Sequence, residues 1–533
     1  MRMLSKGEMF TSCRPIRLSA PSASTRRILI LLQHTMSQQQ TYALLDQDPN
    51  TSRTSSETLQ GLEDARDLPL SEKANKPNHN TRYLLAARDL TLSCLLGIIP
   101  SFLRPRPADC PPKRLHHTAY LDGVRGVAAV AVVSYHMLVD RWGDYESGYV
   151  VSSPTHYILQ LPFLRLVVSG RGMVTTFFVL SGFVLSYKPL RCARAGDLHG
   201  LLETLASSVF RRPFRLYLAT APSMLIAMFM LRAGIAHWLD WDKKATFLEQ
   251  VGDWLDNFFT MANPFRGVDA CGRWGPAYNG PLWTMPLEFR GSMVVFVVVL
   301  GLSRLRPRAR MLGVLGLALF CLYKLNWDVY LFLVGVLIAE IDIIKKAERA
   351  DTEGLAQGYQ EKHTVSTRSR LRRLGLSIVQ ILLFLCCVHV LTFPAIWHET
   401  LGFETLGSLM PAFISESGCM DIVQFTWLSL GGSCMILLLV YSPMLQRPFT
   451  TAFVQYLGRV SFSLYMVHAV VVFTVSWWAR DKAWEAWGLV GHGHWITYLI
   501  AWILAFWAAD IYCRVFDENA VVVGKWVYDN LVS

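Results

Sequence analysis

Residues 120–140, YLDGVRGVAAVAVVSYHMLVD, decide the fold of this chain. Small and aliphatic residues fill most of the stretch, so it predicts a helix that crosses a membrane. The ionisable residues Asp122, Arg125, His136 and Asp140 interrupt it. At about 100° per residue these side chains fall within a sector of roughly 60°. Because charged groups in hydrocarbon are costly and face a protein interior or a water-filled cavity, this polar face predicts one wall of a site.

Apolar runs of similar length continue through most of the chain, which has 533 residues, 52% of them hydrophobic and 17% charged. This composition predicts one polytopic membrane domain, with the lipid bilayer as its surroundings. We expect an all-α bundle of about ten transmembrane helices, each near the length that a bilayer requires. The predicted spans are 119–139, 172–188, 214–233, 282–303, 309–323, 325–344, 374–394, 421–442, 457–478 and 494–513.

Charge differs between alternate loops of the predicted bundle. Lys and Arg gather between the second and third spans and after the fourth and sixth, whereas loop 395–420 has neither. The positive-inside rule then predicts that both termini are cytosolic, with the plasma membrane and the endoplasmic reticulum both possible. Because the basic residues are spread over separate loops, the net charge of +11 reflects topology, and we expect no nucleic-acid partner.

The chain outside the spans is polar or too short to cross a bilayer. The predicted layout is a disordered cytosolic tail at 1–88, an interfacial helix and linker at 89–117, a transmembrane domain at 118–515 and a cytosolic tail at 516–533. Translation beginning at Met1 and at Met36 are both compatible with the first tail. Cys271 and Cys419 fall on the predicted non-cytosolic side, and whether they pair stays open.

Within the opening helix, His136 is the residue that we predict to act as a general base. Histidine titrates near neutral pH and can take a proton from a hydroxyl group. Arg125 precedes it by three turns, about 16 Å along the axis on the same face, and Asp122 at i−3 can pair with Arg125. Plainer interpretations also stay open, namely a histidine bonded to a neighbouring helix and a purely structural Asp–Arg pair. Asp140 is either an orienting partner of His136 or a solvated helix end.

Two further stretches carry candidate binding residues. In 170–187, GRGMVTTFFVLSGFVLSY, small residues including Ser181 permit close helix packing, and Arg171 lies in the polar opening. In 211–217, RRPFRLY, three arginines suit a phosphorylated cofactor, because guanidinium groups and helix N-termini bind phosphate. Positive charge at this place also serves topology, so that alternative stays open.

Two later stretches carry polar residues inside predicted spans. In 280–290, GPLWTMPLEFR, Glu288 is an intramembrane carboxylate that can pair with an arginine or a histidine. In 456–468, YLGRVSFSLYMVH, Tyr465 and His468 share one helix face. His468 can contribute to the site or simply hydrogen-bond within the bundle.

These motifs, taken in order over residues 118–515, resemble those of the acyltransferase 3 family of integral-membrane acyltransferases. LDGVRGVAAVAVVSYH resembles the family's opening R-x10-H motif, with Arg125 and His136 as the pair. TTFFVLSGFVLS resembles the second-helix motif, and FRRPFRLYLA the arginine-rich entry to the third helix. LWTMPLEF resembles the Leu-Trp-Ser-Leu-x-x-Glu element, and YLGRVSFSLYMVH the Ser-Tyr-Ser-Leu-Tyr-x-x-His motif. The order of the motifs makes the resemblance specific.

The chain also departs from the family pattern. Substituted motif positions are Leu216, Ala219, Thr284 and Met285. The family's final helix is often followed by a Glu-x-Pro element, but RVFDENA carries Asp517 and no proline, so no role is transferred to that segment.

The resemblance implies an O-acyltransferase that moves an acyl group, with acetyl expected, from cytosolic acyl-CoA to a hydroxyl of a carbohydrate or small-molecule metabolite. Acyl-CoA is then a co-substrate, and we expect no permanently bound cofactor and no metal. The resemblance makes Arg125 and His136 the essential pair. Together with the arguments from the residues themselves, the predicted site has Asp122, Arg125 and His136 as catalytic residues, Arg171, Arg211, Arg212 and Arg215 on the cofactor, and Ser181, Glu288, Tyr465 and His468 as substrate or supporting residues.

Two alternatives use the same residues without acyl transfer. A multi-pass transporter would use the Asp/Arg/His face as a substrate path, but no internal repeat is visible and the motif order argues against it. A non-catalytic membrane scaffold leaves that polar face unexplained.

Overall fold

A computed structural model of the chain describes residues 99–104, 115–138, 143–153, 157–235, 242–264, 275–356, 367–415, 420–476, 482, 485 and 493–532. The chain divides into two units, Met1–Arg114 and Leu115–Ser533. In the first unit the described residues form a single 3-10 turn, η2 (Ser101–Leu103). The predicted tail at 1–88, most of the predicted interfacial helix, Asp140, Cys271 and Cys419 lie outside the described residues.

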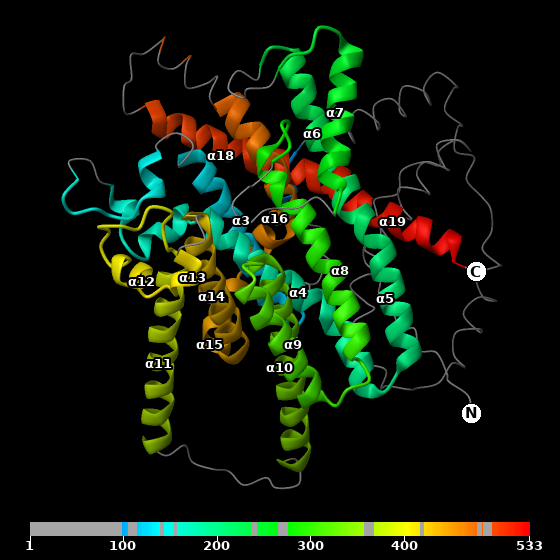
Figure 1. The fold of residues 1–533 in the computed structure, drawn as a ribbon, viewed down its shortest axis with the longest axis vertical. Helices are drawn as coiled ribbons and strands as arrows, with labels where there is room; N and C mark the ends of the chain where they lie inside the picture. The colour runs from blue at the N-terminus through cyan, green and yellow to red at the C-terminus, as the bar shows by residue number, and fades with distance from the viewer. Residues whose placement is uncertain are drawn as a thin grey trace, which may run out of the picture. The chain divides into compact units, whose positions relative to one another are not determined.

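The second unit is a bundle of helices (Figure 1), which confirms the all-α prediction. Its α-helices are α3 (Ala119–Leu138), α4 (Gly170–Ala195), α5 (Leu198–Pro213), α6 (Ala219–Arg232), α7 (Phe247–Ala262), α8 (Thr284–Leu302), α9 (Pro307–Tyr323), α10 (Trp327–Ala356), α11 (Thr367–Leu391), α12 (Glu404–Ser408), α13 (Ala412–Ser415), α14 (Met420–Tyr441), α15 (Pro443–Gln446), α16 (Ala452–Val470), α18 (Gly493–Tyr512) and α19 (Glu518–Leu531). Short 3-10 turns are η3 (Gly143–Glu146), η4 (Ile158–Gln160), η5 (Leu164–Val168), η7 (Gly280–Trp283) and η8 (Arg447–Thr450). The π-helical turns are η6 (Phe214–Leu218), η9 (Val471–Ser476) and η10 (Cys513–Asp517). The part of the chain that the structure describes has no strand, only two isolated bridges.

Eight helical stretches of the described chain are long and apolar enough to cross a membrane, so this is a multi-pass membrane protein. They are Ala119–Leu138, Gly170–Ala195, Leu198–Arg232, Gly280–Leu302, Leu374–Leu391, Asp421–Tyr441, Ala452–Thr474 and Tyr498–Leu531. The other two predicted spans coincide with α9 and α10. Helix α9 has only 17 residues, and α10 carries Asp328, Glu340 and Asp342 among its apolar residues.

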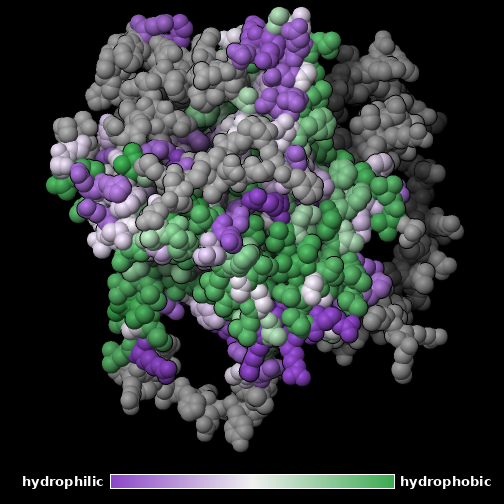
Figure 2. Space-filling model, viewed as in Figure 1, coloured by the Kyte–Doolittle hydropathy of each residue, from purple (hydrophilic) through white to green (hydrophobic). Residues whose placement is uncertain are grey.

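The outer surface of the bundle is apolar. Helix α11 shows this most clearly, because only 11% of its spanning window is buried. Its exposed large side chains include Leu371, Leu374, Leu376, Ile378, Val379, Ile381 and Leu382. Figure 2 shows the hydrophobic surface extending over neighbouring helices, with hydrophilic side chains gathered near the helix ends. This distribution is typical of a surface in contact with lipid.

One predicted loop is helical. The chain between the second and third predicted spans forms the end of α4, a turn at Gly196 and all of α5. Gly196 has φ 72°, which ends α4, and the Asp197 carboxylate then accepts from the Gly200 amide at 2.8 Å to begin α5. Stretch Leu198–Arg232 is therefore helical through η6, so the helix that contains the predicted span 214–233 begins earlier, at Leu198. The charged residues of α5 obscured this extension, because they lower the local hydropathy without breaking a helix.

Close glycine contact joins the two helices that carry the first and last motifs. A side chain at Gly126 of α3 would collide with the backbone of Gly458 in α16, and one at Gly458 would collide with the Asp122 carbonyl. Small residues of this kind let the backbones of membrane helices approach closely. Helices α3 and α16 therefore pack closely together, and both contribute residues to the site described below.

Candidate active site

A cavity of about 140 Å³ lies among α3, α4, α5, α8 and α16. Its polar lining consists of Arg125, Ser181, Arg212, Arg215, Thr284, Glu288, Ser461 and Tyr465. Its apolar lining consists of Val174, Phe177, Phe178, Leu180, Val184, Leu185, Leu216, Met285 and Phe462. The cavity therefore brings together residues from all the sequence motifs, although these lie far apart along the chain.

Glu288 is the central polar residue of this cavity. Its Oε1 atom accepts hydrogen bonds from Ser181 Oγ at 2.6 Å and from Arg212 Nη2. Arg212 Nε donates in turn to Ser292 Oγ at 2.8 Å. The side chains of Arg212 and Glu288 are 10% and 12% exposed, so this ion pair is largely removed from water. A buried pair of this kind fixes α4, α5 and α8 around the cavity, because neither charge is stable there without the other.

Arg125 reaches the same cavity from α3. Asp122 pairs with it at 3.6 Å, and His116 Nε2 lies 3.3 Å from the other carboxylate oxygen of Asp122. Asp122 itself does not line the cavity. Its place is behind Arg125, where it orients the guanidinium group.

Two of the three arginines in RRPFRLY line the cavity. Arg212 is paired as described, whereas Arg215 is exposed and makes no direct hydrogen bond or ion pair with any described residue. Arg211 points away, and its Nε donates to the Ser207 carbonyl of its own helix at 3.1 Å. Arg215 lies within η6, and single π-helical turns are frequent at functional sites.

Arg171 lies apart from these arginines. It binds Asp421 at 2.9 Å, Gln424 at 2.7 Å and Glu146 at 3.2 Å. The sequence grouped Arg171 with the cofactor-binding arginines, but the structure places it in the first turn of α4. Ser181 is ten residues further on, about 15 Å along the axis at helical rise. Ser181 therefore lines the cavity, whereas Arg171 does not.

The loop around Glu146 is held in place by a second buried arginine. Arg165, 3% exposed, donates to the backbone carbonyls of Tyr145, Glu146, Ser147 and Thr392. Its burial lowers the pKa of the guanidinium to about 10. Tyr135 Oη, next to His136 in the chain, donates to Glu146 at 2.6 Å. This network braces the end of α3 that carries His136.

Along α16, Tyr465 is the last residue that lines the cavity. The Tyr465 hydroxyl donates to the Pro281 carbonyl and lies 2.7 Å from Thr284 Oγ1. His468 follows one helical turn beyond, fully buried, with its ring centroid 5.1 Å from that of His136. Neither histidine lines the cavity. The structure thus divides the predicted site into an arginine end, with Arg125, Arg212 and Arg215, and a histidine end, with His136 and His468.

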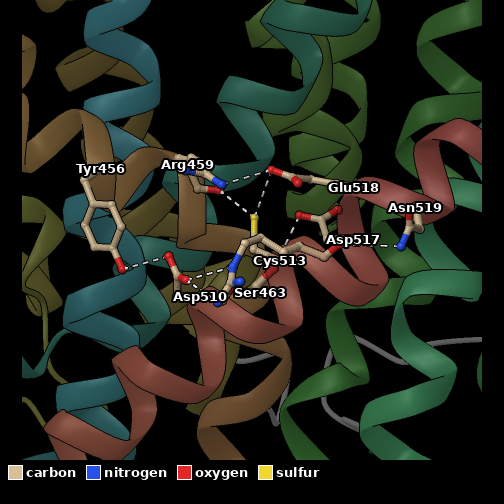
Figure 3. Close-up of polar contacts among 9 residues, drawn as sticks. Tyr456, Arg459, Ser463, Asp510, Cys513, Asp517, Glu518 and Asn519 are labelled. Atoms are coloured by element: carbon tan, nitrogen blue, oxygen red, sulfur yellow. Dashed lines mark hydrogen bonds and ion pairs between the residues drawn. The ribbon is translucent and has the colours of Figure 1, made fainter. Parts of the chain in front are cut away.

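A second polar cluster joins α16 to η10 and α19 (Figure 3). Arg459 pairs with Glu518 at 3.3 Å, and Arg514 pairs with Asp510 at 2.9 Å. The other polar contacts are Tyr456 Oη to Asp510 at 3.4 Å, Ser463 Oγ to Asp517 at 3.4 Å, and Cys513 Sγ to the Arg459 carbonyl and to Glu518, each at 3.8 Å. Sequence reasoning missed this cluster and also Ser292, whose spacing of i+4 from Glu288 was the available signal.

Asp517 connects this cluster to the cavity. Its carboxylate interacts electrostatically with Arg215 and Arg125, so it contributes negative charge to the arginine end. The segment 516–533, predicted as a tail, contains the helix α19. Gly524 of α19 packs against Phe214, and Tyr528 lies 5.5 Å from the ring of Phe210. Helix α19 thus supports the π-turn that carries Arg215.

Comparison with known proteins agrees with this arrangement. The model of the acyltransferase 3 family, described as an acyltransferase domain, matches residues 118–514. O-acetyltransferase PaAT-1 of Phomopsis amygdali is 32% identical over 455 residues, which are 79% of this chain and 86% of that protein. Acyltransferase clz18 of Cochliobolus lunatus is 26% identical over 461 residues, 75% of this chain and 93% of that protein. Acyltransferase R4 of a Phoma species is 23% identical over 472 residues, 78% of this chain and 96% of that protein. No solved structure matches the chain at a significant level.

Proposed function

The chain belongs to the acyltransferase 3 family and is an O-acyltransferase, and from this premise we propose that it transfers an acyl group from acyl-CoA to a hydroxyl of a carbohydrate or small-molecule metabolite. The observation that carries this proposal is a cavity lined by three arginines and by apolar side chains, with His468 one turn beyond the lining residue Tyr465 and the His136 ring beside that of His468. The name of the Phomopsis amygdali relative supports acetyl as the group transferred.

The arginine end suits the phosphates of the donor. Arg215 has no direct partner, and guanidinium groups bind phosphate oxygens through two parallel hydrogen bonds. Arg125 adds a second positive charge from α3. We place this end of the bundle at the cytosolic face, where the positive-inside rule and the supply of acyl-CoA agree.

The size of the cavity indicates which part of the donor it can hold. Ligand pockets commonly occupy about 300–1,000 Å³, whereas this cavity measures about 140 Å³. It is too small for a whole acyl-CoA, so we assign it to the pantetheine arm. The nucleotide would then stay at the mouth beside Arg215, and the apolar lining from Phe177 to Phe462 would surround the arm.

The chemical step follows from the position of the histidines. His136 would take the proton of the acceptor hydroxyl as its oxygen attacks the thioester carbonyl. The new ester bond forms, the C–S bond breaks, and the departing CoA thiolate receives the proton from His136. An acyl carbon placed beside Tyr465 would lie about one helical turn, roughly 5 Å, from the level of His468 on α16.

The test uses purified full-length protein in lipid nanodiscs with radiolabelled acetyl-CoA. Wild-type protein should release CoA thiol and move label to an acceptor present in extracts of the source cells. His136→Ala should abolish both. Unchanged thiol release in that variant would refute the role of His136, and substrate uptake without acyl-CoA would favour the transporter alternative. Metabolite profiling of a deletion strain would then identify the acceptor.

A further inference from the structure

We propose that His468 is a positioning residue, whose Nε2 lone pair accepts a hydrogen bond from the ring of His136 during acyl transfer. The inference rests on the proposed function and names a role that neither the motif nor the family membership assigns to His468.

The first step is the proton arrangement of His468. Its Nδ1 atom lies 2.7 Å from the Tyr465 carbonyl oxygen. A carbonyl oxygen can only accept, so Nδ1 carries a proton, and in the neutral ring Nε2 then presents a lone pair. His468 is 0% exposed, and its Nε2 makes no hydrogen bond with any described residue. A buried acceptor without a partner is uncommon and requires an explanation.

The second step is the identity of the ring that lies beside His468. The ring centroids of His468 and His136 are 5.1 Å apart, with an angle of 36° between the planes. At this separation a hydrogen bond of about 2.9 Å is possible when one nitrogen of each ring lies on the line between the two centroids. Tyr135 and Phe473 also pack edge-on against the His136 ring, at 5.1 Å and 6.1 Å. These aromatic contacts leave His136 oriented between α3 and α16.

The third step is the chemical consequence. A neutral imidazole has one N–H and one lone pair. When His136 donates its N–H to His468, its other nitrogen is necessarily the proton acceptor, which is the form that a general base needs. The orienting group behind a catalytic histidine is usually a carboxylate or a backbone carbonyl. Here a second histidine, itself fixed by the Tyr465 carbonyl, would serve that purpose without adding a charge.

Two variants separate this role from simple packing. In His468→Gln the amide oxygen can occupy the position of Nε2, whereas in His468→Asn the shorter amide can keep the bond to the Tyr465 carbonyl but places no acceptor towards His136. We expect His468→Gln to keep kcat within about threefold and His468→Asn to lose about 10- to 100-fold in kcat, as for other orienting partners. The KM for acetyl-CoA should stay unchanged in both, because His468 does not line the cavity.

Three outcomes would overturn the proposal. One is full activity in His468→Asn, and another is equal loss in both variants with matching falls in thermal stability. The third is an additive loss when His468→Asn is combined with His136→Ala, because a residue that acts through His136 has no further effect once His136 is gone. Absence of acyl transfer in the wild-type protein would instead refute the proposed function, so the two failures are distinguishable.

Discussion

The cavity and the α16–η10 cluster of Figure 3 are both rich in arginine, but they use it differently. In the cluster each arginine has a carboxylate, Arg459 with Glu518 and Arg514 with Asp510. In the cavity Arg212 pairs with Glu288 and Arg125 pairs with Asp122, whereas Arg215 makes no direct hydrogen bond or ion pair with any described residue. A matched pair satisfies itself and holds helices together, whereas an unmatched cation beside a cavity has its binding capacity left for a ligand.

The polar side chains at the histidine end are bonded differently from those in both arginine regions. There His468 is buried, its Nε2 makes no hydrogen bond with any described residue, and its ring lies beside that of His136. The comparison therefore separates residues that hold the fold from residues that hold a ligand or a proton.

The largest effect is expected for His136→Ala. Loss of a positioned general base commonly costs about 10²- to 10⁴-fold in rate, and His136 is the proposed general base. CoA thiol release and label transfer should both fall by that factor, while binding of acetyl-CoA is retained. Retention of more than a tenth of the wild-type kcat would contradict the assignment.

Glu288→Leu should have the next largest effect, on stability. It leaves Arg212 as an unpaired charge in a site that is 10% exposed, and breaking a buried pair costs about 3–5 kcal/mol. The unfolding midpoint in detergent measures this. The control is the double variant Glu288→Leu with Arg212→Met, in which both charges are gone and most of the stability should return. No recovery in the double variant would mean that the pair is not the origin of the loss.

Arg215→Ala should weaken donor binding without unfolding the protein. One charge-assisted hydrogen bond is worth about 1.5–3 kcal/mol, so the KM for acetyl-CoA should rise at least about tenfold. The kcat should change little, because this contact is made equally in the ground and transition states. Arg211→Ala is the matched control on the same helix, since Arg211 does not line the cavity. Equal effects of the two variants would show that general positive charge, rather than Arg215, attracts the donor.

Arg459→Ala should have the smallest effect. Arg459 is 46% exposed and Glu518 is 26% exposed, and pairs open to solvent contribute about 0–1 kcal/mol. Its KM for acetyl-CoA should equal that of the wild type. A rise comparable to that of Arg215→Ala would erase the distinction between the two arginine regions.

The sequence predicted much of this site because its motifs are local. Helical periodicity put Asp122, Arg125 and His136 on one face, and the structure places Asp122 beside Arg125. Intramembrane charge singled out Glu288, which the structure pairs with Arg212. Arg171 lies apart from the other predicted cofactor-binding arginines, because a motif that spans a whole helix contains residues at both of its ends.

Other features depended on helices that are distant in sequence. The buried side chain of Ser292 joins Arg212 only because α5 and α8 lie together. Asp517 contributes to the arginine end only because η10 and α19 return to the helix that carries Arg215. No local pattern contains this information, since each contact is set by how apolar helix faces pack.

By itself, the sequence determined the all-α membrane bundle and the family, because the length of apolar runs and the order of short motifs are properties of the chain alone. Only the tertiary structure decided that Tyr465 lines the cavity, that Arg215 makes no direct hydrogen bond or ion pair with any described residue, and that the ring of His468 lies beside that of His136. The physical reason is that a side chain's partners depend on interhelical packing, in which residues more than three hundred positions apart, such as His136 and His468, come within a few ångströms.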